Sequence, residues 1–190
     1  MPIVRAEGLT KHFRVSDKQP GLAGTLRHLF RRRYRNVEAV KGIAFTIEPG
    51  EIVGFLGPNG AGKTTTIKML TGLIFPSSGS VEVAGFTPFE RKKEFLRQIT
   101  LVMGQRAQLI WDLPARDTLR IHAAIYEIPD AAFRERVDRL SAMLQMEENL
   151  GKPVRKLSLG ERMKGELMLA LVHHPRILFL DEPTLGLDVN

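Results

Sequence analysis

Apolar and polar positions follow two different spacings along this chain, and each spacing predicts one type of secondary structure. Alternation of apolar and polar residues predicts strands over 1–13, 37–56 and 79–85. Continuous apolar runs predict buried strands over Ile99–Met103 and Arg176–Leu180, and the second run is typical of the centre of a parallel sheet. The strand signals therefore recur along the whole chain.

Between these strands, apolar residues repeat every three or four positions. This spacing predicts helices over 63–73, 116–127, 130–146 and 159–173. Asp130, directly after a proline, is expected to cap the third helix. The apolar stripe of the third helix consists of Phe133, Val137, Leu140 and Leu144, and one face of the fourth is expected to carry Met163, Leu167, Ala170 and Leu171. Strands and helices together predict an α/β fold.

A glycine-rich loop joins the strand end Glu51–Leu56 to the first predicted helix. It fits the phosphate-binding pattern G-x-x-x-x-G-K-[ST] with residues Gly57, Pro58, Asn59, Gly60, Ala61, Gly62, Lys63, Thr64 and Thr65. Lys63 is expected to reach the β- and γ-phosphates of a nucleotide, and Thr64 to ligate Mg²⁺. The alternative is a glycine-rich turn without a ligand. The strand–loop–helix context favours the phosphate site, because a helix start attracts anions.

Two carboxylates follow the last predicted strand. Asp181 and Glu182 lie at its C-terminal end, where ligands bind in open parallel sheets. Asp181 is suited to hold Mg²⁺, and Glu182 to polarise an attacking water. Alone, such a pair is as typical of ordinary charges at a strand end as of a catalytic site. The phosphate loop upstream favours the catalytic interpretation.

Composition narrows the class of protein. The 190 residues are 43% hydrophobic and 26% charged, which suits one packed domain. There is no cysteine, so a disulfide framework and a thiolate metal site are excluded. No apolar run approaches the ~18 residues that a membrane-spanning helix needs. If the chain works at a membrane, we expect it to do so through a partner.

Much of the net charge of +7 lies in Arg27–Arg35, in and just after a predicted basic insertion loop at about 14–33. One interpretation is a patch for anionic lipid or nucleic acid. The other, which we favour, is a solvated loop. Nucleic-acid binding is not expected, because aromatic residues are not interleaved with basic ones elsewhere in the chain.

Four motifs occur in an order that resembles one ATPase family. The phosphate loop is followed by Gln105, by Leu157–Glu161 (LSLGE) and by the Asp181–Glu182 pair. LSLGE resembles LSGGQ, the signature of ATP-binding-cassette (ABC) ATPases. The resemblance implies an α/β P-loop NTPase fold: a RecA-like parallel core sheet, an N-terminal antiparallel β subdomain and an inserted α-helical subdomain at about 106–157. The chain would form one partial ATP-binding domain over 1–190, incomplete at its C-terminus.

The resemblance also implies roles for these residues. Gln105 would contact Mg²⁺ and the lytic water. Contacts to ATP held by a second ATPase domain, in a head-to-tail dimer, would come from Ser158, Gly160 and Glu161, and Asp188 would lie in the dimer interface. Glu161 stands where the family usually has glutamine, so its negative charge is expected to weaken the contact with ATP. Ser158 is expected to cap its helix in either case.

Two questions about the roles of aromatic residues remain open. Tyr34, about five residues before Ala39, best matches the aromatic residue that stacks on adenine in the family, and Phe13 is its rival. Trp111, the only tryptophan, lies in a segment that would face a permease. It would either anchor that contact or occupy a core position.

The function implied is an ATP-binding and ATP-hydrolysing subunit that powers export through a separate transmembrane permease, with ATP and Mg²⁺ as cofactors. The loop over 57–66, the GERMKGEL stretch and the basic insertion resemble exporters of the ABC-2 type. Such a subunit would lie at the cytoplasmic face of a bacterial cell membrane. Two alternatives stay open: a soluble ABC ATPase acting in translation or DNA repair, and a subunit without autonomous hydrolysis.

One family element has no counterpart in the sequence. Family members carry a histidine roughly thirty residues beyond the Asp-Glu pair, whereas the last histidines of this chain, His173 and His174, precede Asp181. The final strands of the core sheet are missing too. We therefore expect the 190-residue chain to bind ATP, to hydrolyse it slowly and to be marginally stable.

Overall fold

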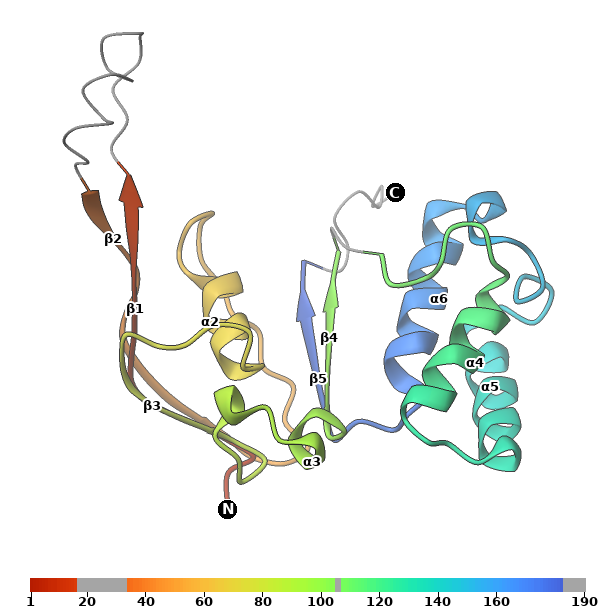
Figure 1. Cartoon of the computed structure of the whole chain (residues 1–190), viewed down its shortest axis with the longest axis horizontal. Coiled ribbons are helices and arrows are strands. Elements are labelled where there is room, and N and C mark those ends of the chain that lie inside the picture. The colour runs from red at the N-terminus through yellow and green to blue at the C-terminus, as the bar shows by residue number, and fades with distance from the viewer. Residues whose placement is uncertain (17–33, 105–106, 183–190) are drawn as a thin grey trace, which may run out of the picture. The chain divides into compact units, whose positions relative to one another are not determined.

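The computed structural model describes residues 1–16, 34–104 and 107–182 (Figure 1). The chain divides into two compact units, Met1–Lys92 and Lys93–Asn190. Each unit has its own sheet and helices and is described by itself.

The first unit is built on an antiparallel sheet. Its strands are β1 (Val4–Ser16), β2 (Tyr34–Ile47) and β3 (Ser78–Val83), in the order β2-β1-β3. Val4 pairs with Ile47 on one side and with Val83 on the other. β1 and β2 continue together as a long hairpin whose last pair is Ser16 and Tyr34 (Figure 1). The expected N-terminal antiparallel sheet is therefore confirmed.

Strand β2 ends at Ile47, nine residues earlier than the sequence pattern predicts. The N–H of Glu51 donates to the carbonyl of Glu48 in a turn that contains Pro49 and Gly50. Proline has no N–H for a ladder, and Gly50 has a φ of 86°, which favours glycine. The turn residues therefore end the strand.

The predicted strand over 51–56 is wrong: these residues form no helix or strand. Ile52 and Leu56 are almost fully exposed. Phe55 packs edge-on against Phe45 of β2, with ring centroids 5.5 Å apart. Apolar composition favours burial, but a strand also requires a hydrogen-bonded neighbour, and no described strand pairs with this segment.

Helix α2 (Lys63–Leu70) follows the glycine-rich loop. Its buried side chains include Ile67, Met69 and Leu70. The helix ends three residues before the predicted end, because Gly72 has a φ of 71° and approaches the 3-10 helix η1 (Pro88–Glu90). A Cβ at Gly72 would lie within 2.1 Å of the Pro88 carbonyl oxygen. This contact ties the end of α2 to the rest of the unit.

The second unit contains a parallel strand pair, preceded by the short helix α3 (Lys93–Leu96). Strands β4 (Ile99–Met103) and β5 (Ile177–Asp181) run parallel, with Ile99 opposite Ile177 and Met103 opposite Asp181. Both predicted strands are confirmed, and their parallel direction agrees with the expected core sheet. Burial is only partial, since Leu180 is 41% exposed.

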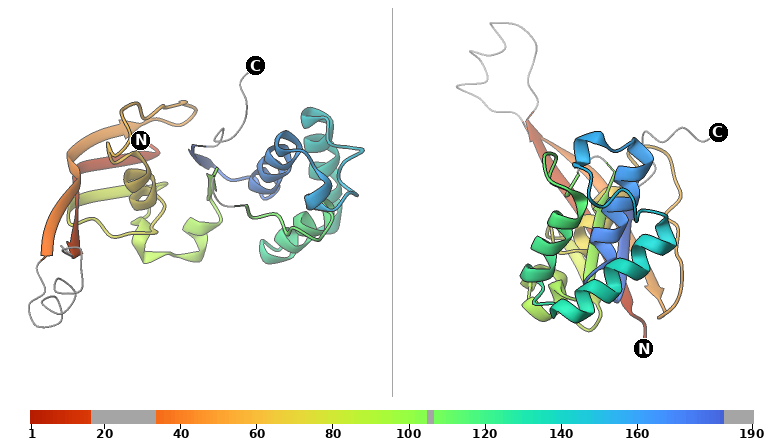
Figure 2. Two further views of the ribbon diagram at one scale, coloured as in Figure 1. Left: turned by 90° about the horizontal axis from the view of Figure 1, so that it is seen from above. Right: turned by 90° about the vertical axis from the view of Figure 1, so that its right-hand side faces the viewer.

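Three helices form the main core of this unit: α4 (Ala115–Ile125), α5 (Asp130–Leu144) and α6 (Leu159–Leu171), with the 3-10 helix η2 (Val154–Lys156) before α6. Both views of Figure 2 show them side by side, in green, teal and blue. The predicted stripe of α5 is confirmed: Phe133 and Val137 are buried, and Leu140 and Leu144 pack against the same core. Nowhere in 1–16, 34–104 or 107–182 is a helix long and apolar enough to cross a bilayer.

Two details of these helices differ from the prediction. Pro129, not Asp130, occupies the N-cap of α5, and Asp130 is the first helical residue without a side-chain cap. In α6 only Ala170 of the predicted face is buried, and the other buried residues are Gly165, Glu166, Met168 and Leu169. α6 packs against β4, α4 and α5, so its buried surface is wider than a single stripe.

Candidate functional site

The glycine-rich loop lies against strand β2 at Gly62. This residue is the N-cap of α2 and has a φ of 86°. A Cβ at Gly62 would lie 2.3 Å from the carbonyl oxygen of Ala39 and 3.1 Å from Cγ2 of Val40. Only glycine satisfies both the left-handed backbone and the close approach. The contact therefore fixes the start of α2 relative to the sheet.

The lysine of the loop is turned back over the loop itself. Lys63 Nζ donates to the carbonyl oxygens of Gly57, at 2.7 Å, and Pro58, at 2.9 Å. The N–H of Ala61 donates to the carbonyl of Pro58, which keeps the loop curled. The ammonium group and the backbone N–H groups of a helix start thus lie in one short segment, a combination that suits the phosphates of a nucleotide.

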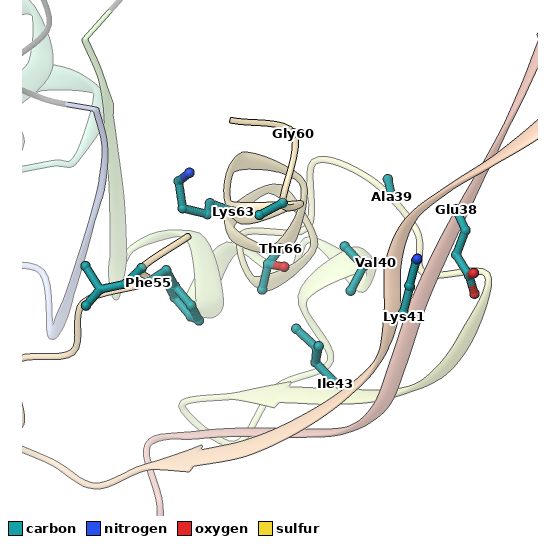
Figure 3. Close-up of a pocket in the computed structure, with 11 residues that line it drawn as sticks. Glu38, Ala39, Val40, Lys41, Ile43, Phe55, Gly60, Lys63 and Thr66 are labelled. Atoms are coloured by element: carbon teal, nitrogen blue, oxygen red, sulfur yellow. The ribbon is translucent and has the colours of Figure 1, made fainter. Parts of the chain in front are cut away.

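A pocket of about 500 Å³ opens beside this loop. Figure 3 shows Lys63 and Thr66 of α2 on one side and Val40 and Ile43 of β2 on another, with Phe55 completing the wall. Its lining mixes apolar side chains with two lysines and one glutamate, so positive charge is in excess. This arrangement fits a ligand that has an anionic end and an apolar or aromatic part.

The two candidate adenine-stacking residues lie on the hairpin of β1 and β2. Both rings are partly exposed, Tyr34 at 44% and Phe13 at 38%. The guanidinium of Arg14 lies 4.4 Å from the Tyr34 ring centroid. Phe13 pairs with Val37, the neighbour of the pocket residue Glu38, whereas Tyr34 is four residues from Glu38. Neither ring lines the pocket.

The carboxylate pair lies at the end of β5 in the second unit. Asp181 is the last residue of β5, and Glu182 follows it with a φ of 49° and an exposed side chain. A left-handed backbone is uncommon for glutamate and turns the chain sharply here. The N–H of Gly104 donates to the Asp181 carbonyl oxygen at 3.0 Å.

Gln105 itself lies outside the described residues, as does the segment Leu185–Asp188 with the proposed interface residue Asp188. Gly104, the residue before Gln105, nevertheless leaves β4 directly beside Asp181. The parallel register therefore brings the chain just before Gln105 to the same sheet edge as the proposed Mg²⁺ ligand.

The LSLGE motif forms the start of α6, as predicted. Ser158 is the N-cap, and its Oγ accepts a hydrogen bond from the N–H of Glu161 at 3.2 Å. In return Glu161 Oε2 accepts from the N–H of Ser158 at 2.7 Å, which completes a capping box. Glu161 Oε1 also accepts from Asn149 Nδ2 at 2.9 Å. Hydrogen bonding with Ser158 lowers the pKa of Glu161. Both oxygens of the Glu161 carboxylate thus accept hydrogen bonds at the start of the helix.

The structure shows one polar residue that sequence reasoning missed. Glu166, in the middle of α6, is only 8% exposed, and its Oε1 accepts from the N–H groups of Gln108 and Leu109. Burial raises the pKa of Glu166, while these two backbone hydrogen bonds oppose the shift. The available signal in the sequence was a glutamate directly before the apolar run Leu167–Leu169 of the helix.

Trp111 is not a core residue. Its side chain is 52% exposed, and the guanidinium of Arg162 on α6 lies 4.4 Å from the ring centroid. The alternative of a core position is therefore wrong. The expectation that Trp111 contacts a permease stays a prediction.

The antiparallel sheet, the parallel strand pair and the phosphate loop together define a P-loop NTPase. The family model described as "ABC transporter" matches residues 40–185, most of the chain. The chain therefore belongs to the ABC transporter family, as the ATP-binding part.

Curated relatives carry the same assignment. The chain is 35% identical over 161 residues to the ABC transporter ATP-binding protein NatA of Bacillus subtilis (strain 168), covering 85% of this chain and 65% of that protein. It is 40% identical over 157 residues to the bacitracin transport ATP-binding protein BcrA of Bacillus licheniformis, covering 83% and 50%. The chain thus spans between half and two thirds of the length of these two relatives.

A solved structure has the same fold. It is cbiO1 from Clostridium perfringens, described as part of the ABC transporter complex cbiONQ. The TM-score is 0.74 at 28% sequence identity, and the alignment covers 98% of this chain and 68% of that one. The expected ABC ATPase fold class is therefore confirmed.

Proposed function

We propose that this chain is the ATP-binding and ATP-hydrolysing subunit of an ABC exporter, powering transport through a separate transmembrane permease. The observation that carries the proposal is the phosphate loop, in which Gly62 is held against β2 and Lys63 is curled over the loop carbonyls. A relative named for Nod factor export, 39% identical over 157 residues, supports the direction of transport.

The loop would hold the triphosphate. Its backbone N–H groups and Lys63 Nζ would neutralise the β- and γ-phosphates, once the ammonium leaves the carbonyls of Gly57 and Pro58. Thr64 and Asp181 supply a hydroxyl and a carboxylate, the oxygen donors that Mg²⁺ prefers. Bound Mg²⁺ would supply charge neutralisation on the phosphate oxygens.

Glu182 is the proposed general base. It directly follows β5, is exposed, and would orient and polarise the attacking water. Gln105 would contact the same water. Catalysis in this proposal rests on positioning and electrostatic stabilisation rather than on a covalent intermediate.

A second ATPase domain would complete the site in a head-to-tail dimer. The residues proposed to contact its ATP are Ser158, Gly160 and Glu161, with Asp188 in the interface. Because Glu161 is held in the capping box, its charge lies at the helix start, where it would oppose a bound phosphate. We place the subunit at the cytoplasmic face of the cell membrane, and we expect no nucleic acid as a partner.

The test compares Lys63→Ala and Glu182→Gln with the unsubstituted protein. Mg²⁺ and ATP at about 100 times Kd stabilise a binding protein by about 2.7 kcal/mol. We expect Lys63→Ala to lose this stabilisation, while Glu182→Gln keeps it and loses ATP turnover. Lys68→Ala, on the same helix, is the matched control. Equal turnover in Glu182→Gln would remove the proposed base, and unchanged ATP binding in Lys63→Ala would refute the phosphate site.

The adenine contact needs its own pair of variants. We propose Tyr34 for stacking, with Phe13 as the alternative nearer to the pocket along the ladder. Loss of an aromatic stacking partner costs about 1–3 kcal/mol for a base, or roughly 5- to 150-fold in Kd. Measured Kd values for ATP in Tyr34→Ala and Phe13→Ala decide between the two. A weakened Phe13→Ala with unchanged Tyr34→Ala would reassign the role.

A further inference from the structure

Glu166 joins the middle of α6 to the chain that follows Gln105. Its Oε1 accepts hydrogen bonds from the N–H of Gln108 at 2.8 Å and the N–H of Leu109 at 2.9 Å. Both donors are backbone groups, so the glutamate fixes the path of the chain rather than the position of one side chain. A buried carboxylate with two N–H donors forms strong, charge-assisted hydrogen bonds.

Packing reinforces this attachment. Leu109 is 5% exposed and lies so close to α6 that a Cβ at Gly165 would be 2.8 Å from its Cδ1. The N–H of Ile110 donates to Thr118 Oγ1 on α4 at 3.3 Å. Three consecutive residues, from Gln108 to Ile110, are therefore fastened to two helices of the same unit.

A second attachment lies on the other side of Gln105. The N–H of Gly104 donates to the Asp181 carbonyl oxygen, and the preceding residue, Met103, pairs with Asp181 in the parallel ladder. The described residues on the two sides of Gln105, Gly104 and Gln108, are thus held at two fixed points. One point is the end of β5, and the other is the Glu166 carboxylate on the helix that begins with the LSLGE motif.

We propose that Glu166 is a positioning residue, which fastens residues 108–109 to α6 and thereby supports the segment of the chain that carries the proposed catalytic residue Gln105. This role rests on the proposed ATPase function. Through the same attachment, a shift of α6 is passed to the chain after Gln105, because the hydrogen bonds and the Leu109 contact join the two directly.

The first test measures the attachment itself, by amide hydrogen exchange in the full chain. Glu166→Ala leaves the N–H groups of Gln108 and Leu109 without their acceptor, so their exchange is expected to accelerate about tenfold or more. Paired amides of β4, such as that of Val102, should stay unchanged. Glu135→Ala, an exposed glutamate on α5, is the matched control. Unchanged exchange at 108–109 in Glu166→Ala would overturn the proposal.

The fluorescence of Trp111 is a second measure of the same change. Trp111 is the only tryptophan, lies two residues after Leu109 and stacks with Arg162 of α6. Its fluorescence is expected to shift in Glu166→Ala and not in Glu135→Ala. If Glu166→Ala fails to fold, Glu166→Asp serves instead, because one methylene less withdraws the carboxylate from both amides while keeping the charge.

The functional test separates positioning from stability. ATP turnover is measured well below the melting temperature, and kcat is expected to fall about tenfold or more in Glu166→Ala, with KM for ATP within about twofold. Glu166→Gln, which keeps an acceptor oxygen, should recover part of kcat. A folded Glu166→Ala protein with freed amides and normal kcat would overturn the proposal.

Failure of the proposed function has a different signature. If the unsubstituted protein does not hydrolyse ATP, the ATPase proposal fails before any substitution is made, and the positioning role fails with it. In a second case the unsubstituted protein hydrolyses ATP, but the Glu166 variants show no larger effect than the control Glu135→Ala. The ATPase proposal then stands, and the positioning role alone is refuted.

Discussion

At the scale of single residues, Gly62 occupies a position that leaves no room for a side chain. Its φ of 86° and the 2.3 Å from a Cβ to the Ala39 carbonyl oxygen are two separate obstacles. We expect Gly62→Ala to destabilise the protein by about 2–4 kcal/mol, since the backbone strain and the clash add. Urea unfolding measures this loss.

Gly85 is the matched control for this prediction. Its φ is 80°, but nothing lies within 4 Å of a Cβ there. Gly85→Ala should therefore cost only the backbone strain, about 1–2 kcal/mol. Equal destabilisation by both substitutions would show that the contact with Ala39 contributes nothing.

A partly buried imidazole predicts how stability depends on pH. Burial lowers the pKa of His173 to about 4, against an opposing hydrogen bond with the Ile99 backbone. The ring stacks on Tyr126 with centroids 4.0 Å apart. The unfolded chain takes up the proton near pH 6.5 and the folded protein only near 4, so stability contributed by the neutral ring is complete above 6.5 and is lost as the pH falls toward 4.

Urea unfolding between about pH 7.5 and about pH 4.5 checks this sign. His173→Phe keeps an aromatic ring against Tyr126 and should flatten the decline in stability. His12→Phe, at a partly exposed position on β1, should leave the decline unchanged. If stability declines equally steeply in His173→Phe, groups other than His173 cause the decline.

At the scale of elements, the start of α6 depends on Ser158. The Ser158 hydroxyl accepts a hydrogen bond from the N–H of Glu161, and alanine offers no acceptor in its place. We therefore expect Ser158→Ala to lower the free energy of unfolding by about 1 kcal/mol. Thermal unfolding measures the effect, with Ser80→Ala on β3 as the exposed control. If Ser158→Ala unfolds at the temperature of the unsubstituted protein, the cap is not stabilising.

Local patterns predicted elements well where the sequence itself supplies the partner groups. Helix α5 followed from its own apolar stripe, and the phosphate loop from its glycines. Residues 51–56 show the limit: they have the composition of a strand, but pairing depends on a neighbour that no local pattern specifies. The wide buried side of α6 was missed for a related reason, because three elements pack against this helix.

The same distinction holds for the site residues. Lys63, Asp181 and Ser158 were identified from motifs whose chemistry is contained in a few neighbouring residues. Glu166 was missed because its partners are 57 and 58 residues away in the sequence. Burial of a helical glutamate becomes visible only when the segment packed against it is known.

At the scale of the whole molecule, the charge of +7 predicts weak and unspecific attraction to polyanions. We expect any binding of a fluorescent DNA duplex to be lost between about 50 and about 200 mM salt, because released counterions dominate such binding. Fluorescence anisotropy measures it. Binding that persists at the higher salt would favour the alternative of a soluble ABC ATPase acting on nucleic acid.

The pairing of β1 with β2 up to Ser16 and Tyr34 also has a practical use. Paired Cα atoms of antiparallel strands lie about 5 Å apart, a gap that a two-residue Asn-Gly turn closes with the twist that strands prefer. We expect replacement of residues 17–33 by such a turn to keep the pairing of β1 with β2, including the pair of Lys11 and Val40. The position between Ser16 and Tyr34 then becomes a graft point for an epitope tag or a reporter peptide.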